Sequence, residues 1–356
     1  MTRSVPTRPT VAAVAAMLLI GAALAGCTGE EAVPTEAIGT VLPALGAPEG
    51  DPLDVRVPTG RLIVTIGQPQ ESVPTVDRRV GVEGDGAWIG VSWQSDTQGM
   101  PRVMRSGEGE FPLAHLTLVA GEERSPLDDV ALVDVTGEPL EAGSEQATGP
   151  LGVDGGAWIA VAGARPGGVV ADLALEVEFD GVTQRFDPAA REAVPAAGTV
   201  AQSLYGQPDA LAQAPRACAA AQVPGAAGRG VRLAPEDASC GLAVARAPWL
   251  VDRGWVSDPA QRWLVVDTTV FPAPVVSVGE RDCGVYDLTD LRASLEGRPL
   301  ILVSRDTDPG RVRLVAEVEG EGERTLLLTA QQELRSGGAP DGACPTSLPL
   351  RWSAVV

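Results

Sequence analysis

Cysteines are the residues of this chain whose type and spacing most clearly imply chemistry. Cys27 stands alone near the amino terminus, and the other four all lie beyond residue 215, at Cys218, Cys240, Cys283 and Cys344. Outside the cytoplasm an even number of cysteines most often forms disulfides, and four cysteines allow three pairings. We expect Cys218–Cys240 together with Cys283–Cys344. A zinc site is disfavoured because no C-x-x-C spacing occurs and the only histidine, His115, lies in the cysteine-free half.

Catalytic chemistry has few candidate residues. We interpret His115, within the alternating segment 111–118, as a strand histidine at a sheet edge or partly buried. Neither a Gly-x-Ser-x-Gly elbow nor a zinc-protease motif occurs. Neighbouring carboxylates such as Asp128 and Asp129 could cleave a glycosidic bond only if the fold placed two of them about 5–9 Å apart. Aromatic residues, which sugar sites usually present, make up 4% of the chain. We therefore predict no enzyme, no metal and no cofactor.

One segment has alternate carboxylates of the kind that bind calcium. Asp306 and Asp308 are followed by Glu317, eleven residues after Asp306. An EF-hand loop needs glycine at its sixth position, where this chain has Arg311. The pattern therefore favours a hairpin turn, with a looser calcium site between loops as the alternative.

Three tryptophans, Trp249, Trp255 and Trp263, lie within 15 residues of one another. They can be anchors of a domain core. The other interpretation is an exposed binding surface made of Trp249, Arg253 and Trp255, since aromatic residues and arginine dominate binding hot spots. If the protein binds a partner tightly, this is the surface at which we expect it.

The amino terminus has the pattern of an export signal. Arg3 and Arg8 precede an apolar run over 11–24, which is shorter than the 20 or so residues of a membrane span. The residues Leu24-Ala25-Gly26-Cys27 resemble the lipobox of bacterial lipoproteins. The resemblance implies that the signal peptide, residues 1–26, is removed and that the Cys27 thiol carries a diacylglyceryl group. Two acyl chains anchor a protein stably, here on the outer face of the cytoplasmic membrane.

Composition limits the partners. Residues 27–54 are rich in Pro, Gly, Ala and acid, which predicts a flexible, acidic tether, although the first domain could recruit a strand from it. The net charge is −20, and loss of Arg3 and Arg8 with the signal brings it to −22. Nothing this acidic is expected to bind nucleic acid. The expected partners are the membrane, through Cys27, and an envelope protein, while the oligomeric state stays open. The lack of lysine and asparagine is typical of a GC-rich, actinobacterial-type genome.

Alternation of apolar and polar residues predicts strands along the whole chain. Leu62, Val64 and Ile66 share one face, and residues 172–179 and 311–319 repeat this scheme. Clusters such as Asp180-Gly181 predict the turns between strands. We therefore predict an all-β chain with a sandwich over 55–190, a linker over 191–215 and a disulfide-containing sandwich over 216–356.

The two halves share an order of motifs. Trp88-Ile89-Gly90-Val91 is followed by Gly137-Glu138-Pro139-Leu140, and Trp263-Leu264-Val265-Val266 is followed by Gly297-Arg298-Pro299-Leu300. This order resembles the immunoglobulin-like, telokin-like domains of Gram-positive lipoproteins. It implies two tandem antiparallel β-sandwiches of that type after the signal peptide and tether. The Trp-to-Gly spacings differ between the halves, which leaves a different sandwich open for the second.

These features predict a membrane-anchored, non-catalytic binding or scaffold module of the cell envelope. The alternatives are a solute- or carbohydrate-capturing lipoprotein and an enzyme of unrecognised type. Capture lipoproteins are commonly two-lobed α/β proteins, and no strand–helix alternation is visible here. A concave site with convergent polar groups would favour capture or catalysis over protein contact.

Overall fold

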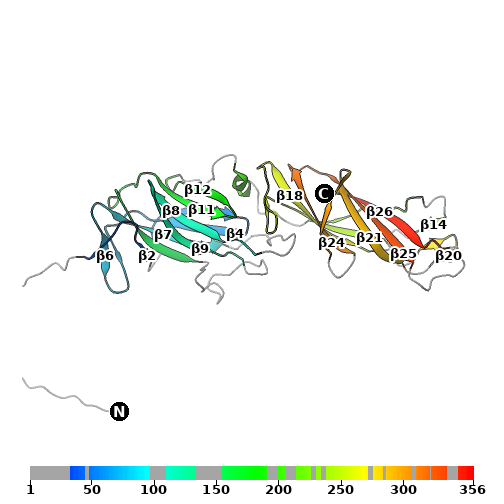
Figure 1. Cartoon of the computed structure of the whole chain (residues 1–356), viewed down its shortest axis with the longest axis horizontal. Coiled ribbons are helices and arrows are strands. Elements are labelled where there is room, and N and C mark those ends of the chain that lie inside the picture. The colour runs from blue at the N-terminus through cyan, green and yellow to red at the C-terminus, as the bar shows by residue number, and fades with distance from the viewer. Residues whose placement is uncertain are drawn as a thin grey trace, which may run out of the picture.

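The computed structural model describes residues 33–44, 48–96, 110–133, 154–190, 199–205, 214–225, 230–233, 238–271, 276–283, 286–305, 310–320, 322–334 and 344–356. The signal peptide, Cys27, the carboxylates Asp306 and Asp308, and the Gly137–Leu140 motif lie outside these residues. The described chain is all-β, as predicted, and forms two sandwiches that follow one another along the long axis of the molecule (Figure 1). No described helix is long and apolar enough to span a membrane.

The first domain packs a five-stranded antiparallel sheet, in the order β2-β10-β7-β4-β3, on a four-stranded one, in the order β12-β11-β8-β9. The first sheet contains β2 (Val41–Pro43), β3 (Pro52–Val57), β4 (Gly60–Ile66), β7 (Ala87–Asp96) and β10 (Gly155–Val161). The second contains β8 (Ala114–Ala120), β9 (Glu123–Val130), β11 (Leu173–Phe179) and β12 (Val182–Phe186). The predicted alternation is confirmed, because Leu62, Val64, Leu175 and Val177 are all buried in one core.

A third, small layer covers the outer face of the five-stranded sheet. It consists of β1 (Thr35–Glu36), β6 (Arg79–Val82) and β5 (Ser72–Pro74), in that order. Its apolar residues bury Trp88 and Trp158, which face outward from the larger sheet. β1 runs parallel to β6, with Thr35 opposite Gly81.

The flexible tether expected over 27–54 is wrong for the described residues 35–44 and 48–54, where the alternative holds that the first domain recruits strands from the segment. β1 pairs with β6, β2 pairs with β10, and β3 begins at Pro52, so the first domain includes much of this segment. The physical reason is a contact between residues far apart in the sequence, since Leu42 and Ala44 pack on the apolar cluster around Trp158.

The second domain is also a two-sheet sandwich. Its five-stranded sheet has the order β13-β15-β18-β24-β23 and its four-stranded sheet the order β22-β21-β25-β26. The strands are β13 (Ala214–Ala217), β15 (Cys240–Ala247), β18 (Gln261–Val270), β21 (Tyr286–Leu295), β22 (Arg298–Pro299), β23 (Ile301–Arg305), β24 (Arg311–Glu319), β25 (Thr325–Leu334) and β26 (Ser347–Val355). Trp352, which is 1% exposed, lies in the core between the sheets.

Shorter elements complete the second domain and the connection to it. A small sheet contains β14 (Val231–Arg232), β19 (Ser277–Val278) and β20 (Arg281–Asp282), and a hairpin contains β16 (Trp249–Leu250) and β17 (Gly254–Trp255). A 3₁₀ helix, η2 (Val200–Leu204), lies in the segment expected as a linker. It packs on the first domain, so this part of the predicted linker 191–215 belongs structurally to that domain.

Candidate functional site

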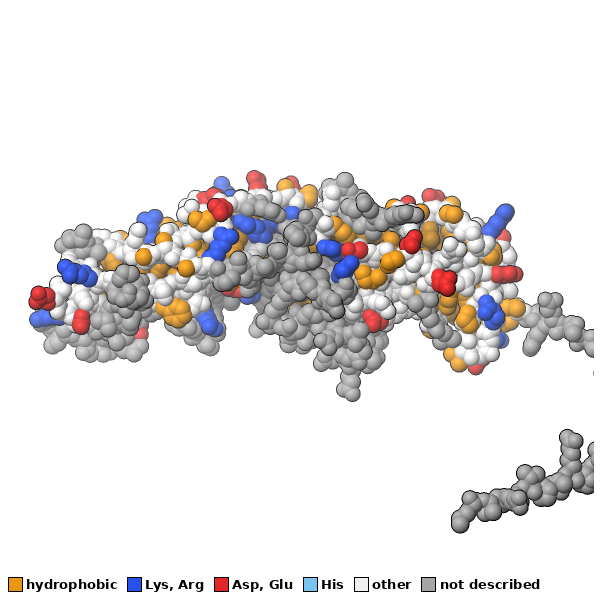
Figure 2. Space-filling view, turned by 180° about the vertical axis from the view of Figure 1, so that it is seen from behind, with side chains coloured by type: hydrophobic (Ala, Val, Ile, Leu, Met, Phe, Trp, Pro, Cys, Tyr) orange, Lys and Arg blue, Asp and Glu red, His pale blue; other side chains and the backbone are white. Residues whose placement is uncertain are grey.

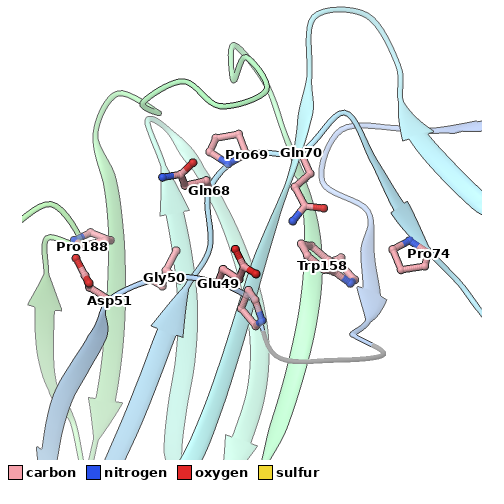
Figure 3. A pocket seen from close by; sticks show the side chains of 11 residues that line it. Glu49, Gly50, Asp51, Gln68, Pro69, Gln70, Pro74, Trp158 and Pro188 are labelled. Carbon is pink, nitrogen blue, oxygen red and sulfur yellow. The ribbon is translucent and has the colours of Figure 1, made fainter.

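A cavity of about 890 Å³ opens on the first domain, beside the small outer sheet (Figure 3). Its walls come from the segment before β3, the connection between β4 and β5, and Trp158 on β10. The lining residues are Pro48, Glu49, Gly50, Asp51, Ile66, Gln68, Pro69, Gln70, Pro74, Trp158 and Pro188. The cavity is therefore bounded by proline rings and one indole, with amide and carboxylate side chains among them.

A glycine on β7, Gly90, allows two of the lining residues to pack closely on the strand. A Cβ atom on Gly90 would lie 2.5 Å from the Trp158 ring and 2.8 Å from Cβ of Pro48. Without that atom the indole and the proline pack directly against the strand backbone. A Cβ atom on Gly67, whose N–H donates to the Gly90 carbonyl at 2.8 Å, would similarly meet Pro48 at 2.7 Å. The close approach of these backbones and rings fixes the shape of the wall.

Polar groups of the cavity are available for a ligand. Within the described part of the chain, the side chains of Glu49, Asp51, Gln68 and Gln70 have neither a hydrogen bond nor an ion pair. The backbone of Gln70 is nevertheless fixed, because its N–H and its carbonyl pair with Trp88 at 2.8 Å each. Such a lining can bind a ligand that combines an apolar face with hydrogen-bond donors or a cation. Among the described lining residues, the groups that could act as a base are the carboxylates of Glu49 and Asp51.

The predicted disulfides are confirmed. Cys218 is bonded to Cys240, with 5.3 Å between their Cα atoms, and Cys283 to Cys344, with 5.5 Å. The first bond ties the end of the edge strand β13 to its neighbour β15. The second joins the segment before β21 to the segment before β26. Both therefore brace the second sandwich.

Two of the three clustered tryptophans, Trp249 and Trp255, lie at the contact between the domains. Trp249 is only 2% exposed and belongs to the core of the first domain, which agrees with the interpretation as a core anchor and contradicts the alternative of an exposed surface at this residue. Its indole N–H donates to Asp180 Oδ2 at 2.6 Å, and that of Trp255 donates to the Phe179 carbonyl at 3.1 Å. Both rings meet the Phe179 ring edge-on, at 5.3 and 6.3 Å between centroids. Arg253 lies in the turn between these two tryptophans and is placed 3.9 Å from Asp252.

The turn that receives these tryptophans follows from local sequence. Asp180 and Gly181, between β11 and β12, have φ of 48° and 76°. Two consecutive residues with positive φ form the tight turn preferred in two-residue hairpins, and Asp-Gly is a favoured pair for it. The turn presents the Asp180 carboxylate to the indole of Trp249. The predicted turn thus positions the first domain's side of the contact between the domains.

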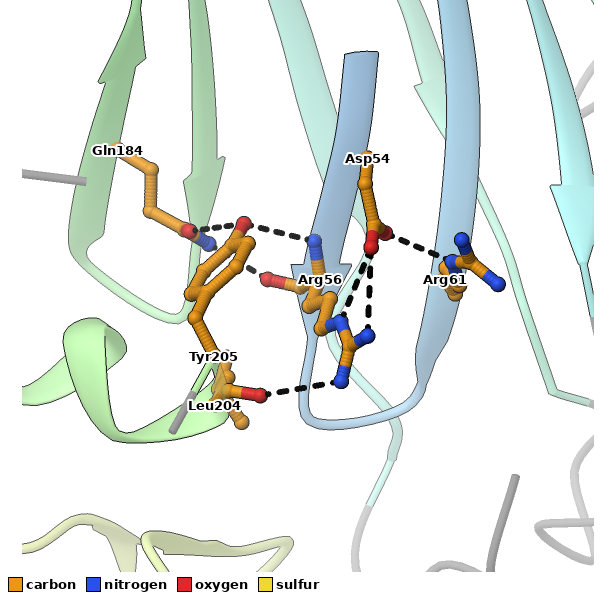
Figure 4. A network of polar contacts seen from close by, with 6 residues as sticks. All are labelled: Asp54, Arg56, Arg61, Gln184, Leu204 and Tyr205. Atoms are coloured by element: carbon orange, nitrogen blue, oxygen red, sulfur yellow. Dashed lines mark hydrogen bonds and ion pairs between the residues drawn. The ribbon is translucent and has the colours of Figure 1, made fainter. Parts of the chain in front are cut away.

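A polar network attaches the connecting segment to the first domain (Figure 4). The Tyr205 hydroxyl accepts a hydrogen bond from the Arg56 N–H at 2.8 Å and donates to Gln184 Oε1 at 3.0 Å. The Gln184 amide in turn donates to the Arg56 carbonyl at 2.9 Å. Burial raises the pKa of Tyr205 above its ordinary value, so the hydroxyl stays protonated and keeps its donor role. Asp54 accepts hydrogen bonds from Arg56 at 3.3 Å and from Arg61 at 2.7 Å.

The outer face of the four-stranded sheet in the first domain carries ion pairs. Glu176 on β11 is buried between Arg124 on β9 and Arg185 on β12, and Arg185 donates to its carboxylate at 2.8 Å. Burial alone would raise the pKa of Glu176, but hydrogen bonds and charge from the two arginines outweigh it and lower that pKa.

His115 lies on β8, between β9 and β11, rather than at a sheet edge. Its side chain is 47% exposed and contacts Asp129 at 2.5 Å. Among the described residues no group of three or more His, Cys, Asp or Glu could hold a metal ion. The structure therefore does not bring the candidate residues of the sequence together into one site, and the cavity is lined by residues that belong to no recognised motif.

No family model matches this chain, and no curated protein is significantly similar to it in sequence.

Proposed function

We propose that this chain is an exported lipoprotein, anchored through a diacylated Cys27, which acts as a non-catalytic binding module on the outer face of the membrane. Its two sandwiches would be immunoglobulin-like domains. The lipobox, the short apolar signal and the disulfides support the location. The lack of a recognised catalytic motif in the sequence supports a non-catalytic role.

The cavity on the first domain is the observation that carries the binding role. It combines an aromatic and proline-lined wall with four polar side chains that have no partner among the described residues. A concave polar site by itself favours capture of a ligand over flat protein contact, so an envelope protein would occupy it only through a segment that enters the cavity.

Solute or carbohydrate capture is the second candidate, and the volume of the cavity favours it. About 890 Å³ is within the size range of small-molecule pockets, in a site that is broadly open to solvent. An indole wall with amide and carboxylate groups also suits a ligand with hydroxyl or amino groups.

Site-specific photocrosslinking in the membrane-anchored protein tests the proposal. A photoreactive residue replaces Gln70 in the cavity, and a second variant carries it at Val355, an exposed position on β26. One dominant envelope protein crosslinked from position 70 but not from position 355, and lost in Cys27→Ala, would support the binding module. If position 70 captures no protein while a glycan or solute raises the melting temperature, capture replaces it. If neither occurs, the cavity is not a binding site.

A further inference from the structure

The turn between β5 and β6 exposes an apolar side chain next to arginines. Val76 is 85% exposed, although most large apolar side chains of the described chain are buried. Two hydrogen bonds close the turn: the Thr75 N–H donates to the Arg78 carbonyl at 2.7 Å, and the Thr75 hydroxyl donates to it at 2.8 Å. Arg78 and Arg79 follow directly. The turn therefore exposes the apolar side chain of Val76 to solvent, with the cationic side chains of Arg78 and Arg79 beside it.

Strand pairing places the first described residues of the chain, just before β1, beside this turn. β1 runs parallel to β6, with Thr35 opposite Gly81, and the Gly81 N–H donates to the Pro34 carbonyl at 2.8 Å. Because the two strands are parallel, the amino-terminal end of β1 lies at the amino-terminal end of β6, next to Arg79 and the turn. Val33 lies at this end. Figure 1 shows β6 at the end of the first domain remote from the second.

The distance to the anchor is short. Cys27 precedes Val33 by six residues, which span at most about 20 Å when fully extended. Because the first domain already includes β1, which begins at Thr35, the chain between Cys27 and the domain is too short to hold the domain far from the lipid. The β5–β6 turn is therefore within reach of any bilayer that holds Cys27.

The charge of the turn is unusual for this chain. The mature protein is strongly acidic, yet residues 75–79 contain two arginines and one acid, Asp77. Arg79 is held by Ser72, to whose carbonyl it donates at 2.7 Å, whereas the Arg78 guanidinium has no partner among the described residues. Glu71 and Glu83, on either side of β5 and β6, are exposed and would be repelled by an anionic surface. Repulsion of the acidic remainder and attraction of the arginines both favour contact through the turn. Figure 2 shows apolar, basic and acidic side chains interspersed at this end of the molecule.

We propose that the β5–β6 turn, residues 75–79, contacts the membrane surface, with Val76 in the interfacial layer and Arg78 and Arg79 on anionic lipid phosphates. This rests on the proposed anchoring at Cys27. Arginine binds phosphate through several donors, and an apolar side chain adds affinity at the interface. Pro74, which lines the cavity, would then lie close to the bilayer, so the occupant of the cavity would be bound near the membrane.

The test uses chemical anchoring, so that it does not depend on lipidation in cells. The mature chain, residues 27–356, is coupled through the Cys27 thiol to a maleimide lipid in phosphatidylglycerol-containing vesicles, since the other four cysteines are in disulfides. A fluorescent non-natural residue is placed at position 76 or, as the control, at the exposed position 355 of the second domain. We expect quenching by spin-labelled lipids to be at least about threefold stronger at position 76.

Equal quenching at both positions would overturn the proposal. Arg78→Glu and vesicles of phosphatidylcholine alone should each reduce quenching at position 76 about twofold or more. If quenching there is unchanged by both, anionic headgroups are not the partner. Failure of these tests leaves lipidation of Cys27 untouched, because that is read separately from the mass of the native amino-terminal peptide.

Discussion

Replacement of Trp249 by alanine should separate the two domains without unfolding either of them. The side chain belongs to the second domain, but it is 2% exposed within the core of the first. It contributes its buried area, an edge-on contact with Phe179 and a hydrogen bond to Asp180. Loss of a buried tryptophan costs about 3–5 kcal/mol, and this cost falls on the junction because both sandwich cores are otherwise intact.

The expected result is visible in chemical unfolding followed separately in each domain by hydrogen exchange. In the native protein the domains should unfold together or stabilise each other, whereas in Trp249→Ala their transitions should separate and small-angle scattering should show a broader range of domain orientations. Asp180→Asn retains an acceptor oxygen and should lose about 1 kcal/mol or less, while Asp180→Ala leaves the indole N–H unpaired and should lose about 1–3 kcal/mol.

A matched control is Trp352→Phe. The indole of Trp352 lies in the core of the second domain and donates to the Ala238 carbonyl there, so this change should lower the stability of that domain without uncoupling the two. Coincident transitions in Trp249→Ala, with a loss below about 0.5 kcal/mol, would refute the view that this tryptophan holds the domains together.

Three further results are expected. The fold lowers the pKa of Glu176, so the ionised carboxylate stabilises the fold fully above the ordinary pKa of 4.5. This stabilisation disappears as the pH falls through the lowered pKa. The melting temperature of Glu176→Gln should therefore depend less on pH in the acid range than that of the native protein. Gly90→Ala should cost about 1–3 kcal/mol by forcing apart the indole ring and the strand beneath the cavity, whereas Gly241→Ala, with open space around its Cβ position, should cost far less in the same denaturant titration. Removing the Cys283–Cys344 disulfide, which closes a 61-residue separation, should cost about 1 kcal/mol more than removing the other, whose separation is 22 residues, and equal losses would contradict the loop-entropy reasoning.

Much of the fold could be predicted because its signals are local. Alternation along β4 and β11 repeats every second residue, and the Asp180-Gly181 pair specifies its own turn. The strands β1 and β2 were missed because they span two and three residues, which is too short for alternation to show. Their pairing partners, β6 and β10, lie far along the chain, and no local pattern encodes them.

The candidate sites were harder to predict because burial depends on distant residues. The sequence left Trp249 open between a core anchor and an exposed surface, because its neighbour Phe179 lies 70 positions earlier in the sequence, in another domain. The cavity draws on four separate segments, and its polar residues are of common types. The closest sequence signal was the run Gly67-Gln68-Pro69-Gln70, in which proline and glycine interrupt the strand pattern just where the wall of the cavity forms.

Anchoring through Cys27 is the central claim, and the amino-terminal peptide of the native protein tests it most directly. Mass spectrometry of the protein extracted from membranes should find a mature chain that begins at Cys27 and carries a diacylglyceryl group on its thiol. Cys27→Ala should release the chain from the membrane or leave it uncleaved. A mature chain that begins at another residue, or that carries an unmodified Cys27, would contradict the account.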